Sequence, residues 1–305
     1  MRTTTKKSLV LGIGIACALG FAAFVGDAAD SATKVASDWQ PISTINGCNK
    51  RHEATFVQAG DKYYLMGGRR IQVVDIYDPH TNTWYQGKRP PIELHHFQPV
   101  VVDGLIYILG AMTGPYPNEI PIANIFIYDP IKDRWIVGPE IPFHRRRSGA
   151  GTVVYDGKIY LVSGIVNGHR SGWVPWLDFF DPATNSWTEL ADAPHSRDHF
   201  QSVVVDDLLY AVGGRRSGSG ETVFHGTVAA VDVYDFETDT WKTLPGPIGD
   251  LRQRKTELPL SLSLASDSGI TAEEVFWSRW GVGGYRRMVR GDRLRRSCRI
   301  GVAGR

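Results

Sequence analysis

The chain of 305 residues is long enough to bury a large core, as one repeat array or as two domains. Its formal net charge of +2 is unevenly distributed, because residues 252–305 carry twelve Lys and Arg against five Asp and Glu and residues 30–251 are mildly acidic. An acidic body lacks the basic footprint that phosphate contacts need, which excludes a general nucleic-acid binder.

Residues 1–29 have the layout of a secretory signal peptide. Arg2, Lys6 and Lys7 precede an uncharged, mostly apolar run over 8–25, and small residues follow at 26–29. We therefore predict export, to the periplasm or the extracellular space. An uncleaved membrane anchor is the alternative, since the 17 residues Leu9–Val25 are at the short limit for spanning a bilayer. Lipid attachment at Cys17 is a third option, although Gly14 stands where such motifs normally have Leu.

After the leader, the first and last segments of the chain give fewer indications of structure than the middle does. Three cysteines (Cys17, Cys48 and Cys298) do not make a disulfide framework, and a Cys48–Cys298 pair is not favoured. Residues 30–50 form an N-terminal segment, and residues 251–305 form a divergent basic tail with no visible repeat. We expect this tail to be poorly ordered.

One eight-residue motif occurs four times, at Tyr77–Trp84, Tyr128–Trp135, Phe180–Trp187 and Tyr234–Trp241. Successive motif tryptophans lie 51, 52 and 54 residues apart, and a period of that size indicates an array of one supersecondary unit. We place the four units of residues 51–250 at about 51–93, 94–146, 147–196 and 197–250.

Each unit has the pattern of four short strands. In the second unit the β-branched run Val100–Val102 is followed by the turn residues Asp103-Gly104 and the apolar run Tyr107–Ala111. This pattern predicts two strands joined by a tight hairpin, and the Asp-Pro of the motif predicts a turn between a third strand and the Trp-bearing fourth. No helical period occurs, so we predict an all-β fold of four-stranded antiparallel sheets, each packed between two neighbours.

The repeats resemble those of the kelch family, which are marked by a Gly-Gly pair, a spaced Tyr and a Trp. The resemblance covers about 39–245, with Gly110-Ala111 and Ser163-Gly164 as departures from the pair and Phe236 as a departure from Pro. It implies a β-propeller, in which four-stranded blades surround a central channel.

The ring that these repeats imply looks incomplete. Trp39 and its neighbours Lys34–Pro41 resemble a lone fourth strand, which in such propellers completes the last blade, but no recognisable partner strands follow Trp241. We favour a frameshift or a truncation in the gene. The alternative is a native divergent tail with one edge strand around Leu258–Leu264, where leucines alternate.

Candidate ligand-binding residues lie where connections between strands two and three, and between blades, reach the same face. Arg and His gather there, and the planar guanidinium suits carboxylate or sulfate oxygens. The candidates are Arg51, Glu53, Arg69, Arg70, His95, His96, Arg147, His169, Arg197, His199 and Arg215. Glu53, His96 and His199 hold equivalent positions of their units. Because His95 and His96 are adjacent at a strand start, we expect their side chains on opposite faces, and we predict no metal site and no cofactor.

Three functions remain open on this evidence. The first is a binding module for a protein or a glycan, with an anionic ligand as the physically sensible choice and no obligate oligomer. The second is an enzyme that resembles the sialic acid mutarotases, with Arg147 holding a carboxylate and Glu53 as acid–base; a galactose-oxidase-like copper site is disfavoured because Cys48 has no Tyr near it. The third is a truncated chain without activity. We favour the binding module.

Overall fold

The fold is described from a computed structural model, in which residues 40–218, 226–245 and 301–302 are described. Their ordered elements are almost entirely strands, with one short 3₁₀ helix at Phe143–Arg145 (η1). No helix among the described residues is long and apolar enough to cross a membrane. The predicted signal peptide, Trp39 and the Leu258–Leu264 alternation lie outside the described residues.

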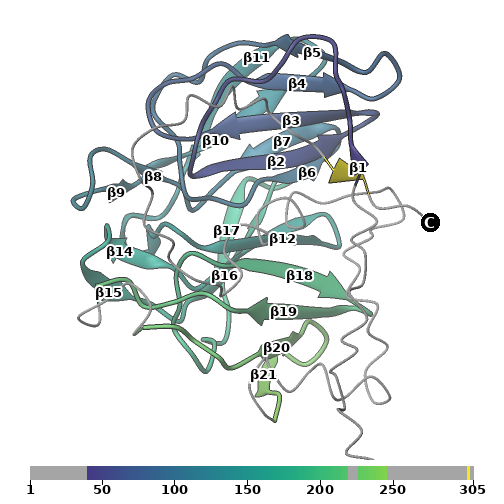
Figure 1. Cartoon of the computed structure of the whole chain (residues 1–305). Helices are drawn as coiled ribbons and strands as arrows, with labels where there is room; N and C mark the ends of the chain where they lie inside the picture. Colours follow the sequence, from purple (N-terminus) through teal and green to yellow (C-terminus); the bar gives the residue numbers. More distant parts are fainter. Residues whose placement is uncertain (1–39, 219–225, 246–300, 303–305) are drawn as a thin grey trace, which may run out of the picture. The chain divides into compact units, whose positions relative to one another are not determined.

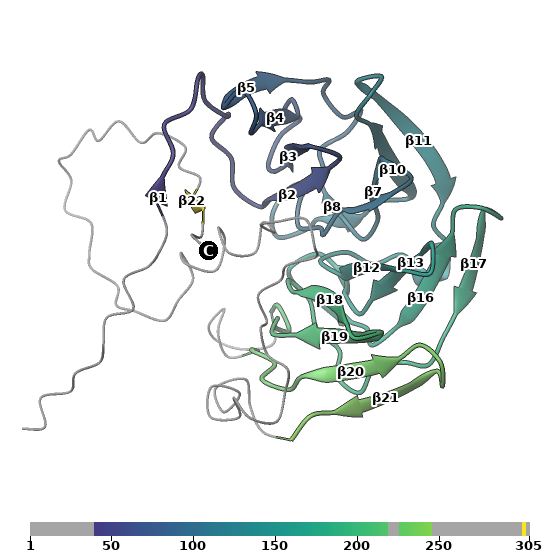
Figure 2. The ribbon, with the colours of Figure 1, turned by 90° about the vertical axis from the view of Figure 1, so that its right-hand side faces the viewer.

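Four antiparallel sheets of four strands follow one another along the chain as the blades of a β-propeller (Figures 1 and 2), which confirms the predicted fold class. Blade 1 consists of β2 (Ala54–Ala59), β3 (Lys62–Gly67), β4 (Asp75–Asp78) and β5 (Thr83–Gln86). Blade 2 consists of β6 (Val100–Val102), β7 (Leu105–Ile108), β10 (Asn124–Asp129) and β11 (Arg134–Glu140). Blade 3 consists of β12 (Gly151–Tyr155), β13 (Lys158–Val162), β16 (Leu177–Asp181) and β17 (Ser186–Glu189). Blade 4 consists of β18 (Gln201–Val205), β19 (Leu208–Val212), β20 (Asp232–Asp235) and β21 (Thr240–Thr243).

The connections between second and third strands add two small hairpins where the sequence predicted loops. In blade 2, β8 (Met112–Thr113) pairs with β9 (Ile120–Pro121), and in blade 3, β14 (Ile165–Asn167) pairs with β15 (Ser171–Trp173). Outside the blades, β1 (Gln40–Pro41) pairs antiparallel with β22 (Gly301–Val302). Cys48 is disulfide-bonded, whereas the sequence did not favour a disulfide in the chain after the leader.

Neighbouring blades are joined through their first strands. The strand pairs β2 and β6, β6 and β12, and β12 and β18 are in contact. Gln98, just before β6, adds polar links: its Oε1 accepts from Thr152 N at 3.0 Å and from Ser202 N at 2.9 Å, and its Nε2 donates to Ser202 O at 2.8 Å. One side chain of blade 2 thus ties the first strands of blades 3 and 4 together.

The repeated Tyr-Asp…Trp motif makes the same contacts in successive blades. Its Asp accepts hydrogen bonds from the backbone two and three residues later, as Asp78 does from His80 N at 2.9 Å, which builds the turn between strands three and four. In the three copies that begin with Tyr, its hydroxyl donates to the residue five positions later, as Tyr128 does to Asp133 at 2.6 Å and Tyr234 to Asp239 at 2.7 Å, whereas the third copy begins with Phe180. The motif therefore closes a turn and places an aromatic pair between blades.

Candidate functional site at the loop face

The residue just ahead of each blade's first strand has the same unusual backbone. Glu53, His96, Gly149 and His199 occupy equivalent positions of the four blades, with φ of 58°, 53°, 59° and 54°. Their backbones are linked across blades, since His96 N donates to Glu53 O at 3.2 Å and His199 N donates to Gly149 O at 2.8 Å. This left-handed turn brings the side chains of successive blades toward one another, and Gly149 leaves the third position without one.

Glu119, in the β8–β9 connection of blade 2, joins three blades. Its Oε1 accepts from Arg69 Nη2 of blade 1 at 2.6 Å, and its Oε2 lies 2.9 Å from His169 Nδ1 of the β14–β15 hairpin. Arg69 also donates to Glu53 and, at 3.0 Å, to the carbonyl of Gly114. Because the Glu119 side chain is fully buried and doubly paired, it pins the loops of blades 1, 2 and 3 to one another.

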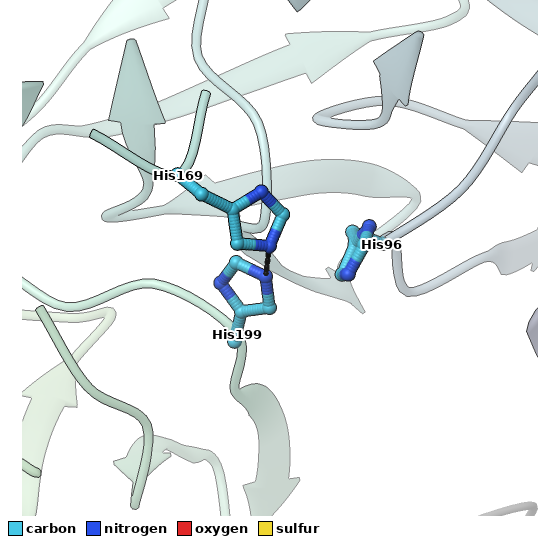
Figure 3. A group of neighbouring side chains, drawn as sticks. All are labelled: His96, His169 and His199. Atoms are coloured by element: carbon cyan, nitrogen blue, oxygen red, sulfur yellow. Dashed lines mark hydrogen bonds between the residues drawn. The ribbon is translucent and has the colours of Figure 1, made fainter. Parts of the chain in front are cut away.

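Three histidines from three blades, His96, His169 and His199, come together (Figure 3), and His169 among them contacts Glu119. His169 Nε2 and His199 Nε2 are 2.9 Å apart, and the ring centroid of His96 is 5.0 Å from that of His169 and 4.5 Å from that of His199. Asp198 holds His199 through Nδ1, and Ser217 donates to Asp198 Oδ1 at 2.6 Å. We call Glu53, Arg69, His95, His96, Glu119, His169, Asp198 and His199 the loop-face cluster.

The adjacent rings of His95 and His96 also touch, with 2.7 Å between their Nδ1 atoms. The expectation that these side chains point to opposite faces is therefore wrong. It holds for two extended residues, whereas the positive φ of His96 turns its ring back toward His95.

Burial sets the protonation of the cluster. It lowers the pKa of His96, and neighbouring His199, His95 and His169 lower it further. Burial likewise lowers the pKa of His199, although Asp198 opposes the shift. For Glu119, burial acts to raise the pKa, but the hydrogen bonds from Arg69 and His169 outweigh it and hold the pKa below the ordinary value. His96 and His199 are therefore neutral near pH 7, while Glu119 is ionised.

Three of the candidate arginines lie inside blades. Arg51 pairs with Asp75, Arg147 with Asp178, and Arg197 with Asp232, and each guanidinium also donates to backbone carbonyls, as Arg197 Nη1 does to Ala211 O at 3.1 Å. Their side chains are at most 1% exposed. This packing assigns them to the framework of the blade and argues against the ligand contact expected from the sequence. Arg147 bonds Asp178 and backbone carbonyls inside blade 3, whereas Glu53 bonds Arg69, so the two residues of the mutarotase-like pair have different partners.

Blade 2 shows what replaces this ion pair. The equivalent positions are Leu94 and Phe126, both buried in the same apolar cluster. Blade 2 thus has apolar residues in place of both the Arg and the Asp, so neither charge is left buried without its partner.

The remaining candidates lie at the edge of the cluster. Arg215 is partly buried, and its Nε donates to Ser217 Oγ at 3.0 Å. Arg70 is exposed, and its backbone N donates to Glu93 at 2.8 Å. Of the sequence candidates, the structure thus brings Glu53, Arg69, His95, His96, His169 and His199 together. Glu119 and Asp198 were not predicted as members of the site, nor was Ser217, which donates to Asp198.

Comparison with known proteins agrees with this architecture. The kelch motif model matches residues 146–194 and 196–247. The Kelch-like protein terF of Aspergillus terreus is 31% identical over 225 residues, which cover 68% of this chain and 48% of the relative. Kelch-like protein 41a of Danio rerio is 27% identical over 190 residues (62% and 30%), and alpha-scruin of Limulus polyphemus is 28% identical over 181 residues (56% and 19%).

The chain spans less than half the length of these relatives. The solved structure of YjhT is 16% identical, with a TM-score of 0.57 over 67% of this chain and 68% of that one, which indicates a common fold. The repeated motif, the four blades and the matches to kelch proteins lead to one conclusion: the chain belongs to the kelch-repeat β-propeller family.

Proposed function

We propose that the chain is a binding module that holds a protein partner on its loop face. The observation that carries the proposal is a fixed loop with exposed apolar side chains. Tyr116 is 68% exposed and Ile120 is 61% exposed, while Glu119 between them is only 2% exposed. The bonds of Glu119 to Arg69 and His169 hold this loop in place.

A loop held in this way suits protein recognition. Aromatic and aliphatic side chains surrounded by polar groups are the usual anchors of protein interfaces. A loop that is already ordered loses little conformational entropy on binding, so more of the contact energy is retained. Ile71, 44% exposed on the corresponding connection of blade 1, extends the apolar surface. Kelch-family membership supports the same role.

Selection from a displayed random-peptide library tests the proposal. We expect the folded chain to enrich a peptide consensus, and the Tyr116→Ser/Ile120→Ser variant to lose at least about tenfold in affinity for that peptide. The control is Ile131→Ser, because Ile131 is 93% exposed but lies in the turn between β10 and β11, away from the loop face. No enrichment, or equal loss in the control, would refute the proposal.

A second candidate ligand is an anionic glycan. Arg215 favours it, because no carboxylate among the described residues lies within ion-pair distance of this partly buried guanidinium, although Asp198 and Glu53 are near enough to influence its charge. An array of sulfated and sialylated glycans tests this candidate. Binding that Arg215→Gln abolishes would support it, and an array without signal would reject it.

Export of the chain belongs to the same proposal, on the basis of the charge and hydropathy of residues 1–29. Mass spectrometry of the protein isolated from cells that express the full gene tests it. An N-terminus near residue 30 would support cleavage of a signal peptide, whereas a chain that retains Met1 and stays in the cytosol would contradict it.

A further inference from the structure

The three histidines of the loop-face cluster have the arrangement of a ligand set for a metal ion. One ring nitrogen from each of His96, His169 and His199 lies within 4.8 Å of the other two. Figure 3 shows the three rings turned toward one common point, with the Nε2 atoms of His169 and His199 adjacent. A tetrahedral Zn²⁺ ion with bonds of about 2.0–2.1 Å places its ligand nitrogens roughly 3.3 Å apart, so small ring rotations suffice.

The outer nitrogens of these histidines contact carboxylates, as is usual for metal-binding histidines. His169 Nδ1 lies 2.9 Å from Glu119, and His199 Nδ1 bonds to Asp198. His96 Nδ1 faces His95, and Glu53 Oε2 lies 3.5 Å from it. A histidine that donates its Nδ1–H to a carboxylate presents the lone pair of Nε2, which is the atom that binds a metal.

The backbone holds the three ligands in place. His96 and His199 occupy the same left-handed position of blades 2 and 4, and His169 sits on the turn of the β14–β15 hairpin of blade 3. Gly149, the residue of blade 3 at that position, has no side chain, and a Cβ there would lie 3.5 Å from His199 Nδ1. The space left by the missing side chain at Gly149 therefore lies next to the imidazole ring of His199.

The charge of the surroundings also suits a cation. The carboxylates of Glu53, Glu119 and Asp198 lie against the histidines and outnumber the two nearby arginines: Arg69 is already engaged by two of these carboxylates, and Arg215 is near enough to His199 to influence its charge. The three histidine side chains are 10% or 11% exposed, so solvent reaches them although they are mostly covered.

From this geometry we propose that His96, His169 and His199 bind a divalent transition-metal ion, with Zn²⁺ as the best match to three imidazoles. Three protein ligands leave a fourth coordination position for water or for a ligand of the loop face. The proposal departs from the expectation of no metal site, whose reason was the opposite orientation of His95 and His96. It does not depend on the proposed protein partner.

The test uses the untagged chain, freed of metal with a chelator and titrated with Zn²⁺ by calorimetry. We expect one ion per chain, and a loss of at least roughly 100-fold in affinity for each of His96→Asn, His169→Asn and His199→Asn. His80→Asn and His144→Asn serve as controls, because these side chains are 74% and 70% exposed and lie outside the cluster. Far-UV circular dichroism confirms that each variant is folded.

A second measurement identifies the ligands independently of affinity. Co²⁺ bound in place of Zn²⁺ should show the intense visible absorption of a tetrahedral site, and this absorption should vanish in His169→Asn and His199→Asn. Absence of stoichiometric Zn²⁺ binding by the folded parent chain would overturn the proposal. It would also be overturned if Glu53→Gln removed binding while His169→Asn left it intact, because the ion would then sit among Glu53, His95 and His96, which also converge.

Discussion

Glu119 and His169 lie 2.9 Å apart, although they belong to different blades and are 50 positions apart in the chain. The same carboxylate accepts from Arg69 of a third blade at 2.6 Å. A fully buried carboxylate with two such partners should contribute strongly to stability, because its removal takes one acceptor from Arg69 and one from His169.

We therefore predict that Glu119→Gln lowers the free energy of unfolding by about 2 kcal/mol in urea denaturation. Glu140→Gln is the matched control, since Glu140 pairs with Arg146 but is 77% exposed, and its loss should cost at most about 0.5 kcal/mol. Equal effects of the two substitutions would show that Glu119 does not hold the blades together.

Two motif tryptophans offer a test of one hydrogen bond. Trp241 Nε1 donates to Ala191 O of the preceding blade at 2.8 Å, whereas the buried Nε1 of Trp187 has no acceptor among the described residues. Both substitutions to Phe remove a similar apolar area, but only Trp241→Phe breaks a bond. We expect Trp241→Phe to cost about 1 kcal/mol more than Trp187→Phe in thermal or urea unfolding. A larger cost for Trp187→Phe would contradict this assignment.

The effect of the buried ion pair of blade 4 on the free energy of unfolding should depend on whether one or both of its partners are replaced. Arg197→Leu leaves Asp232 buried without its guanidinium, which we expect to lower the free energy of unfolding by about 3–5 kcal/mol. The double variant Arg197→Leu/Asp232→Phe copies Leu94 and Phe126 of blade 2 and should recover a substantial part of that loss. A double-mutant cycle in urea measures the coupling, and strict additivity of the two single effects would count against it.

The first hairpin of blade 4 carries a strained turn residue. Asp206 and Asp207 have φ of 49° and 58°, while the equivalent second positions of blades 2 and 3 are Gly104 and Gly157, with φ of 75° and 69°. Glycine adopts this conformation without the steric cost that a Cβ brings. We predict that Asp207→Gly raises the free energy of unfolding by about 1 kcal/mol. Gly157→Asp, where an added Cβ meets no atom within 4 Å, should lower it by a similar amount in urea denaturation, and no change in either variant would contradict the assignment of strain.

The tyrosines between blades should make the fold sensitive to alkali. Burial, together with Tyr85, Asp61 and Asp133, raises the pKa of Tyr64 to about 12, and burial and Asp133 raise that of Tyr128. The folded chain therefore holds these protons more tightly than the unfolded chain does. The resulting stability is complete below the ordinary pKa of 10.0 and is lost as pH rises through the folded value.

We expect urea midpoints to fall steadily as the pH rises above the ordinary tyrosine pKa, and ultraviolet difference spectra to show tyrosinate forming at these positions only near unfolding. Tyr128→Phe should reduce the pH dependence. Ordinary titration of all tyrosines in the folded chain would contradict the prediction.

The repeat, the class of fold and the turns are encoded locally and could be predicted from the order of residues alone. Asp78, Tyr128 and Trp241 act within a few residues of chain or against the adjacent blade, so their spacing in the sequence reports directly on the blade that they build. The same period also assigned Glu53, His96 and His199 to equivalent positions of their units.

Which of the candidate residues meet depends on tertiary contacts that the spacing does not encode. Arg51, Arg147 and Arg197 have the sequence context of loop arginines, but strands of their own blades bury them against aspartates. His169 and Glu119 have no counterpart in the repeat, and they reach the cluster through hairpins specific to blades 3 and 2. Local period encodes backbone geometry, whereas burial and side-chain encounters depend on segments that folding brings together from 50 or more residues away.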